Sequence, residues 1–232
     1  MMKYLIAIAV FGAICAVKSQ DVCHNNVETA CSLSTLSALD GMFTKESSGI
    51  CDARYGGINS IEPEIQAYIN SQLTKSYEYL LMATNFNSYQ KNRPGFEKLY
   101  RGLSDRSFDN TIVLIKQLTR RGGKVDFNTR HESPAAVSKQ QLKMELDELH
   151  SLALALDNEK QLSTGAIHVH TRASHTSERD PEMAQFLEEN FLGKQAKTVR
   201  KISGYASDLS KLMNQGDPSL AVYLFDEYLY KQ

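Results

Sequence analysis

The chain has 232 residues, which is enough for one large domain or two small ones. Its formal net charge is −1 and 23% of its residues are charged, so the bulk charge indicates neither nucleic acid nor an anionic membrane surface as a partner. Beyond the N-terminal apolar stretch, no segment is long and apolar enough to span a bilayer.

Residues 1–19 are expected to be a secretory signal peptide. Lys3 precedes an apolar run from Tyr4 to Val17, and Val17 and Ser19 are small residues before a cleavage at Gln20. The run is too short for a transmembrane anchor. We therefore expect a protein that enters the secretory pathway and is secreted to the extracellular space.

Residues 20–59 are predicted to form a disulfide-bearing N-terminal extension. Cleavage of the signal peptide would remove Cys15 and leave Cys23, Cys31 and Cys51. In an oxidising compartment, three thiols predict one intrachain bridge together with a free thiol or an interchain bridge. A buried odd thiol is the alternative, and the spacing does not decide the pairing.

The longest helical pattern covers residues 61–88, with Ser60 as the expected N-cap and Glu62 and Pro63 in the first turn. An apolar stripe, which we expect to face partner helices, runs along it beside a more polar seam. The stripe is Ile65, Ile69, Leu73, Tyr77, Leu80 and Leu81, and the seam is Gln72, Ser76, Tyr79 and Ala83.

Pro94 opens a second helix of similar length, which the Gly122-Gly123 pair ends. Residues 123–137 carry no helical pattern and could extend over roughly 50 Å, against roughly 42 Å for a 28-residue helix. A third helix can therefore start at the opposite end of the bundle. This predicts an all-α fold, a four-helix bundle with one long crossover between helices 2 and 3. The expected buried face of the second helix is Phe96, Leu99, Tyr100, Leu103, Thr111, Leu114, Ile115 and Leu118.

A capping box at residues 138–141 should open the third helix, and the polar stretch 168–179 should interrupt or bend it. Asp180-Pro181 should cap a fourth helix. A turn at residues 214–218 precedes a short fifth C-terminal helix, apolar enough to need a partner outside its own subunit. Residues 60–232 are therefore expected to form one bundle domain. The expected core positions are Leu142, Leu146, Leu149, Leu152, Ala153 and Leu156 on the third helix and Met183, Phe186, Leu187, Phe191, Ala196, Val199 and Ile202 on the fourth.

Several segments, in order, resemble ferritins: 77–82 (YEYLLM), 121–125 (RGGKV), 186–197 and 220–226 (LAVYLFD). The signal peptide and the cysteine-bearing extension resemble the secreted ferritins of insects. The resemblance implies the ferritin-like fold and a hollow cage of twenty-four subunits, with the fifth helix at an inter-subunit channel. It also implies entry of Fe2+ and storage of an Fe3+ mineral, without an organic cofactor.

An iron-oxidising ferritin subunit needs several carboxylates and a Glu-x-x-His pair that converge from different helices. By resemblance, the first-helix carboxylate falls on Gln72, the Glu-x-x-His pair falls on Ser107 and Asn110, and the third-helix glutamate falls on Asp157. None of the first three can supply a charged oxygen ligand. The chain therefore resembles a light-type, non-catalytic subunit.

Tyr79 and Gln195 match the family pattern, but neither binds iron strongly alone. We therefore expect a separate heavy-type ferritin subunit as the partner that oxidises iron, possibly linked by a disulfide. Two alternatives stay open. One is an active ferroxidase that uses Tyr79, Asp157 and unconventional ligands, and the other is a secreted helical-bundle signalling protein.

For iron entry, the resemblance places a threefold-channel carboxylate at Glu188, with Gln185 in place of its acidic neighbour and His168 near a channel histidine. For mineral nucleation, only Asp105 and Asp109 remain of the acidic cluster on the second helix.

Two further groups contain residue types that can bind metal ions. Asp147 and His150 have an Asp-x-x-His spacing, but a solvated helix face explains them more simply. His168, His170 and His175 form a short histidine tract whose helical spacing does not bring the three side chains together.

Overall fold

The computed structural model describes residues 52–127, 147–175 and 179–232. The chain divides after Ala53, and the account below concerns the unit Arg54–Gln232. The predicted signal peptide, the three cysteines of the extension and the capping box at 138–141 lie outside the described residues.

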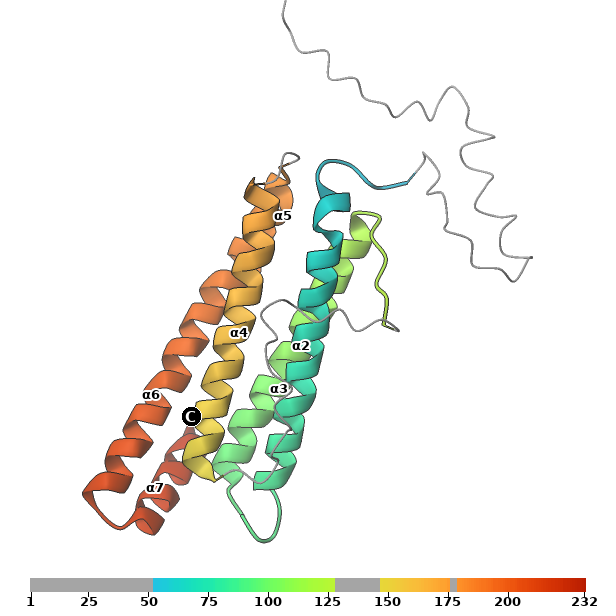
Figure 1. Cartoon of the computed structure of the whole chain (residues 1–232). Helices are drawn as coiled ribbons and strands as arrows, with labels where there is room; N and C mark the ends of the chain where they lie inside the picture. The colour runs from blue at the N-terminus through green and yellow to red at the C-terminus, as the bar shows by residue number, and fades with distance from the viewer. Residues whose placement is uncertain (1–51, 128–146, 176–178) are drawn as a thin grey trace, which may run out of the picture. The chain divides into compact units, whose positions relative to one another are not determined.

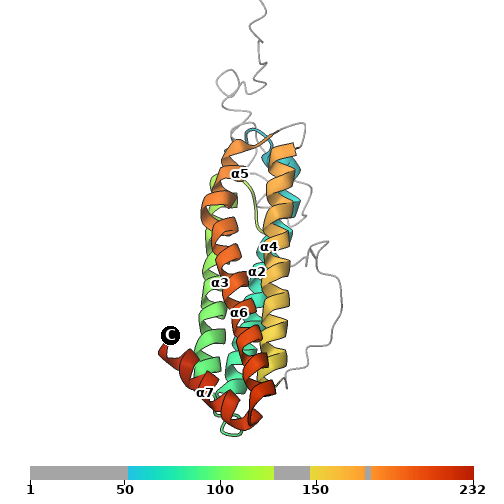
Figure 2. The same ribbon diagram turned by 90° about the vertical axis from the view of Figure 1, so that its left-hand side faces the viewer.

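Within those residues, all regular secondary structure is helical. The long helices lie side by side, and the short C-terminal helix α7 (Pro218–Lys231) packs across one end of them (Figures 1 and 2). The elements are α2 (Ile58–Phe86), α3 (Pro94–Arg120), α4 (Glu148–His175), α5 (Pro181–Leu187), a single π-helical turn η3 (Glu188–Leu192), α6 (Gly193–Gln215) and α7 (Pro218–Lys231).

The long crossover between α3 and α4 is confirmed by a contact between the starts of the two helices. Arg93, just before α3, places its Nε 3.2 Å from Glu148 Oε1 in the first turn of α4. The starts of α3 and α4 are therefore neighbours, so the connection must return along the length of the bundle. The expected four-helix bundle with one crossover and a short fifth helix is confirmed.

The start of α2 differs from the prediction. The helix begins at Ile58, and the Ser60 hydroxyl donates to the Gly57 carbonyl at 2.8 Å, so Ser60 is not the N-cap. Glu62 consequently lies beyond the first turn. Its carboxylate accepts instead from the Arg54 guanidinium, at 2.7 Å, and from the Lys124 backbone N–H, at 2.9 Å.

The prediction of which face of α2 is buried is correct only for the first half of the helix. Ile65 and Ile69 are buried, but Tyr77 and Leu81 are 57% and 44% exposed on this chain. Beyond Ile69, the face directed into the bundle is the more polar seam. The whole seam, Gln72, Ser76, Tyr79 and Ala83, is buried.

The predicted ends of α3 are confirmed. Pro94 occupies its first position, and Gly122 follows the helix with a left-handed φ of 74° that favours glycine. Gly95 is needed for another reason, since a Cβ there would lie 2.0 Å from the Asp226 carbonyl oxygen of α7. The Asp226 carboxylate also accepts from the Phe96 N–H, so α7 is fixed to the start of α3.

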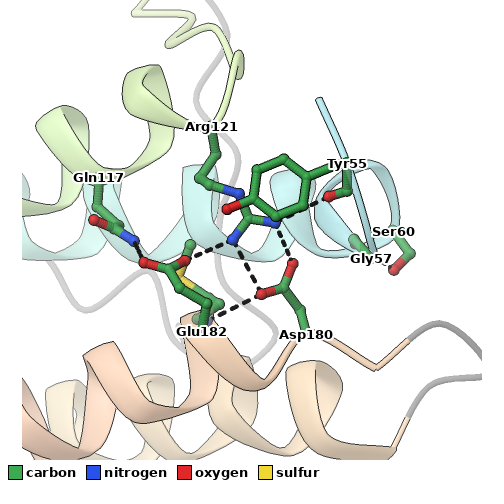
Figure 3. Close-up of polar contacts among 8 residues, drawn as sticks. Tyr55, Gly57, Ser60, Gln117, Arg121, Asp180 and Glu182 are labelled. Atoms are coloured by element: carbon green, nitrogen blue, oxygen red, sulfur yellow. Dashed lines mark hydrogen bonds and ion pairs between the residues drawn. The ribbon is translucent and has the colours of Figure 1, made fainter. Parts of the chain in front are cut away.

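Arg121, the residue that follows α3, is buried in a polar cluster (Figure 3). Its guanidinium donates to both carboxylate oxygens of Asp180, at 2.6 and 3.1 Å, and also to Glu182. It also donates to the Tyr55 carbonyl at 2.9 Å and stacks on the Tyr55 ring, with Cζ 4.0 Å from the centroid. Arg121 therefore joins the end of α3, the start of α5 and the segment before α2.

The second half of the bundle departs from the prediction in two places. α4 continues without a break to His175, so the polar stretch does not interrupt it up to that residue. Asp180 caps α5 as predicted, by accepting from the Met183 N–H at 3.0 Å, but the π-helical turn η3 was not predicted. Ala153 and Ala196, expected in the core, are exposed.

Two apolar clusters fill the bundle, one towards each end. The cluster near α7 contains Phe86, Phe96, Tyr100 and Phe225, and the Phe86 and Phe96 rings stack at 5.2 Å. The other lies near α5 and contains Tyr68 and Phe191. On its outer side α7 leaves several large apolar groups exposed: Leu220, Tyr223, Leu224, Tyr228 and Tyr230. No helix within the described ranges is long and apolar enough to cross a membrane.

Candidate functional site

A buried polar layer separates the two apolar clusters. Each long helix contributes to it at the point where its apolar positions pass from one cluster to the other. A buried polar group costs free energy unless it is paired, so such a layer needs an explanation beyond packing. Its buried members are Gln72 and Ser76 from α2, Ser104, Ser107 and Thr111 from α3, Asn158 and Glu159 from α4, and Gln195 from α6.

Glu159 is the carboxylate at the centre of this layer and is fully buried. Its Oε1 accepts a hydrogen bond from the Tyr79 hydroxyl at 2.9 Å and an ion-paired hydrogen bond from Arg106 Nη2 at 2.8 Å. Arg106 reaches it from α3 and is only partly exposed. The same guanidinium also donates to the Thr198 hydroxyl on α6. Arg106 thus links three helices around one acidic group.

The electrostatics of these groups follow from their burial. Burial raises the pKa of Glu159 above its usual value, and Arg106 and the Tyr79 hydrogen bond oppose that rise. Burial and the neighbouring Glu159 charge hold the pKa of Tyr79 well above its usual value, so its phenol stays neutral. With Glu159 ionised, the charges of Arg106 and Glu159 cancel within the layer.

The positions carried over from the ferritin pattern supply neutral groups here. Gln72 donates to the Tyr68 hydroxyl at 2.7 Å, while burial raises the pKa of Tyr68 to about 12. Gln72 Oε1, Ser107 Oγ and both amide atoms of Gln195 have no hydrogen-bond partner in the described part of the protein. Asn110 is only partly buried.

Asp157 does not lie in this layer. Its side chain is exposed, whereas Glu159, two residues later, reaches Tyr79 in the interior. Two residues turn a helix by about 200°, which places the two side chains on opposite faces. Gln72, Tyr79, Ser107 and Gln195 are all buried, and Glu159, rather than Asp157, is the α4 carboxylate that reaches Tyr79. Sequence reasoning missed both Glu159 and Arg106.

A di-iron centre does not fit these side chains. Such a centre takes several carboxylates and histidines as ligands, and this layer supplies one carboxylate that already holds a guanidinium. Within the described ranges, no three His, Cys, Asp or Glu side chains lie together in a way that could hold a metal ion.

Glu188 begins the π-helical turn and is exposed. His170 Nε2 lies 2.7 Å from its Oε1, and Gln185 donates instead to Glu189 at 2.8 Å. His168 lies away from this pair, 3.3 Å from Glu64 on α2, and His175 is exposed. The three histidines do not converge, as expected from their spacing.

Asp105 and Asp109 are both exposed on α3, and Asp105 pairs with Arg101 at 3.2 Å. Asp147 accepts from the His150 N–H at 2.8 Å at the start of α4, and its carboxylate also contacts the His150 ring. Asp147 and His150 thus cap a helix end on the surface.

Comparison with known proteins agrees with the helical bundle. The family model described as a ferritin-like domain matches residues 64–212. The chain is 63% identical to the ferritin light chain of Drosophila melanogaster, over the full length of both chains. It is 39% identical to the ferritin light chain of Trichoplusia ni, over all of this chain and 99% of that one. The crystal structure of Trichoplusia ni secreted ferritin superposes with a TM-score of 0.78 and 38% identity, covering 90% of this chain and 98% of that one.

Proposed function

This chain belongs to the ferritin family, and we propose that it is an iron-storage subunit of the light type, which builds the cage but does not oxidise iron. In this proposal the subunit contributes wall and channel surface to a cage that keeps Fe3+ as a soluble mineral. Fe2+ is the incoming cargo, and its oxidation takes place on a heavy-type partner subunit.

The observation that carries the proposal is the link between Arg106 and Glu159 in the polar layer. A guanidinium 2.8 Å from the carboxylate supplies the positive charge that a metal ion would otherwise supply. An iron ion would have to displace Arg106 and would then find one carboxylate among amide and hydroxyl groups. Hard cations need more anionic oxygen than that to repay their dehydration.

Assembly is supported by the apolar groups that the chain leaves exposed. Large apolar side chains are exposed on this chain at Tyr77 and Leu81 of α2 and on the outer face of α7. Contacts between subunits would bury them. We extend the proposal to a cage that this chain shares with a heavy-type subunit. One of Cys23, Cys31 and Cys51 is then available for a covalent link to that subunit, in a protein secreted after cleavage of residues 1–19.

For the iron route, we propose Glu188 as the residue of this subunit that attracts Fe2+ at a channel. It is exposed, and its contact with His170 leaves its second carboxylate oxygen available. Nucleation on this chain would fall to Asp105 and Asp109. We expect it to be weak, because Arg101 neutralises Asp105.

The test is to purify the chain alone and together with a heavy-type ferritin subunit and to measure particle mass by light scattering. A particle many times heavier than the 26.0 kDa chain, which retains iron when the heavy-type subunit is present, is the expected result. A stable monomer would contradict the proposal and favour a helical signalling protein. Non-reducing electrophoresis of the same sample reports whether the two chains are covalently linked.

The rival proposal, an active ferroxidase that uses Asp157, has its own test. Asp157→Ala should abolish Fe(II) oxidation under that rival. Since the Asp157 side chain is exposed and lies away from Tyr79, we expect no change.

A further inference from the structure

A groove of about 620 Å³ runs between α4 and α6. Its lining residues Lys160 and Ala196 directly follow Glu159 and Gln195 of the polar layer, but their side chains are exposed. Figure 2 shows these two helices side by side. Lys160 and Thr164 line the groove from α4, and Val199, Arg200 and Ser203 line it from α6.

The groove carries one cation on each wall. Lys160 and Arg200 are exposed, and neither forms an ion pair within the described ranges. Lys197, one turn before Arg200 on α6, adds a further positive charge. The sequence has no acidic residue from 190 to 207. The two walls therefore present unneutralised positive charge across an open groove.

The donors available to a ligand are few and defined. The Ser163 and Thr164 hydroxyls donate to carbonyls of their own helix, at 2.8 and 2.9 Å, so their protons are used. The side chains that can donate hydrogen bonds to a ligand are those of Lys160, Arg200 and Ser203. Val199 also lines the groove. Lysine, arginine and serine together are the donors that proteins use for phosphate.

One nearby carboxylate works against an anion. Asp157 is exposed three residues before Lys160, on the adjacent turn of α4. Glu159 points into the bundle, where Arg106 neutralises it, so it does not contribute to the groove. The groove thus keeps a surplus of positive charge that Asp157 lowers only in part.

We propose that this groove is a binding site for a tetrahedral oxyanion of the inorganic phosphate type. The anion is held between Lys160 and Arg200, with Ser203 as a third donor, and its charge replaces the absent ion-pair partners of both cations. The site is independent of the light-type function proposed above, because it shares no residue with the polar layer.

The test is equilibrium dialysis of inorganic phosphate against the full chain in its assembled form. The double variant Lys160→Gln with Arg200→Gln is compared with the wild type and with Lys211→Gln. Lys211 is an exposed lysine near the end of α6, outside the groove. Removing both cations should weaken phosphate binding about tenfold. Each exposed charge contact typically changes an affinity by a few-fold, and the variant removes two of them.

The Lys211→Gln control should bind phosphate as the wild type does, and Asp157→Asn should bind it more tightly. Phosphate affinity equal to the wild type in the double variant would overturn the proposal. So would an equal loss in the Lys211→Gln control, or weaker binding by Asp157→Asn. No phosphate binding by the assembled wild-type particle would overturn it as well.

Discussion

Replacing Arg106 by alanine isolates the interaction on which the polar layer depends. The variant leaves Glu159 fully buried, with only the Tyr79 hydroxyl as a partner. It also removes the contact between Arg106 and Thr198 on α6. We expect the free energy of unfolding to fall, and the fall to depend on pH.

The loss of unfolding free energy has an upper limit, because the unpaired Glu159 can take up a proton instead of staying charged. Taking 4.5 as the pKa of a glutamate in the unfolded chain, keeping the group neutral at pH 7 costs about 3.4 kcal/mol, and at pH 5 about 0.7 kcal/mol. Because Arg106 is 32% exposed, water can reach part of the space that it leaves. We therefore expect a loss of about 2–3 kcal/mol at pH 7, at the lower edge of the range for broken buried ion pairs.

The direction of the pH dependence follows from the raised pKa of Glu159. A carboxyl group whose folded-state pKa lies above its unfolded value binds protons more readily in the folded chain. Its destabilising effect is therefore absent below the unfolded pKa and grows as the pH rises towards the folded one. Loss of Arg106 raises the folded pKa further, so the variant and the wild type should converge as the pH falls from 7 to 5.

Urea unfolding followed by helical circular dichroism at pH 7 and pH 5 measures this difference, with particle size checked by light scattering. Arg101→Ala is the matched control, because it removes an exposed pair with Asp105 that should contribute less than about 0.5 kcal/mol at either pH. A loss for Arg106→Ala no larger than for this control, or an equal loss at both pH values, would refute the reasoning.

Three other substitutions, one of them compared with a control variant, test separate parts of the structure. Gly95→Ala should cost about 3 kcal/mol, because its Cβ would lie 2.0 Å from a backbone oxygen of α7; faster proteolysis of the C-terminal helix would report it, and wild-type resistance would count against it. Asp180→Ala should lower the free energy of unfolding by about 3–5 kcal/mol, because it leaves Arg121 buried without its main partner. Asp217→Ala, the control, removes an exposed helix cap and should lower it by about 1 kcal/mol. Similar urea midpoints for the two variants would contradict this. Gln72→Glu alone should leave Fe(II) oxidation unchanged, since Ser107 and Gln195 still supply no charged ligand and Arg106 occupies Glu159; any clear gain in rate would contradict this.

Much of the fold could be predicted because its signals are local. Pro94, Gly122 and Asp180 each act through their own backbone geometry or cap, and the structure confirms all three. The crossover followed from chain length alone. The fifth helix was predicted from its apolar content after a proline, and α7 starts at Pro218.

The candidate site was less predictable, because a helical pattern does not say which face enters the core of a subunit that assembles. On α2 the apolar residues Tyr77 and Leu81 are exposed on this chain, while the polar Gln72 is buried. The third-helix carboxylate was assigned to Asp157 by resemblance alone, and Glu159, which is buried, lies two residues further on the opposite face of the helix. Arg106 carried no local signal, since its partners, Glu159 and Thr198, come from two other helices, α4 and α6.

The most direct test of the central proposal is stopped-flow Fe(II) oxidation by this chain assembled without any other subunit. With Arg106 paired to Glu159, the one carboxylate of the polar layer, the chain alone should oxidise Fe(II) no faster than buffer. The same preparation assembled with a heavy-type subunit should oxidise it rapidly. Fast, stoichiometric oxidation by this chain alone would contradict the proposed light-type function.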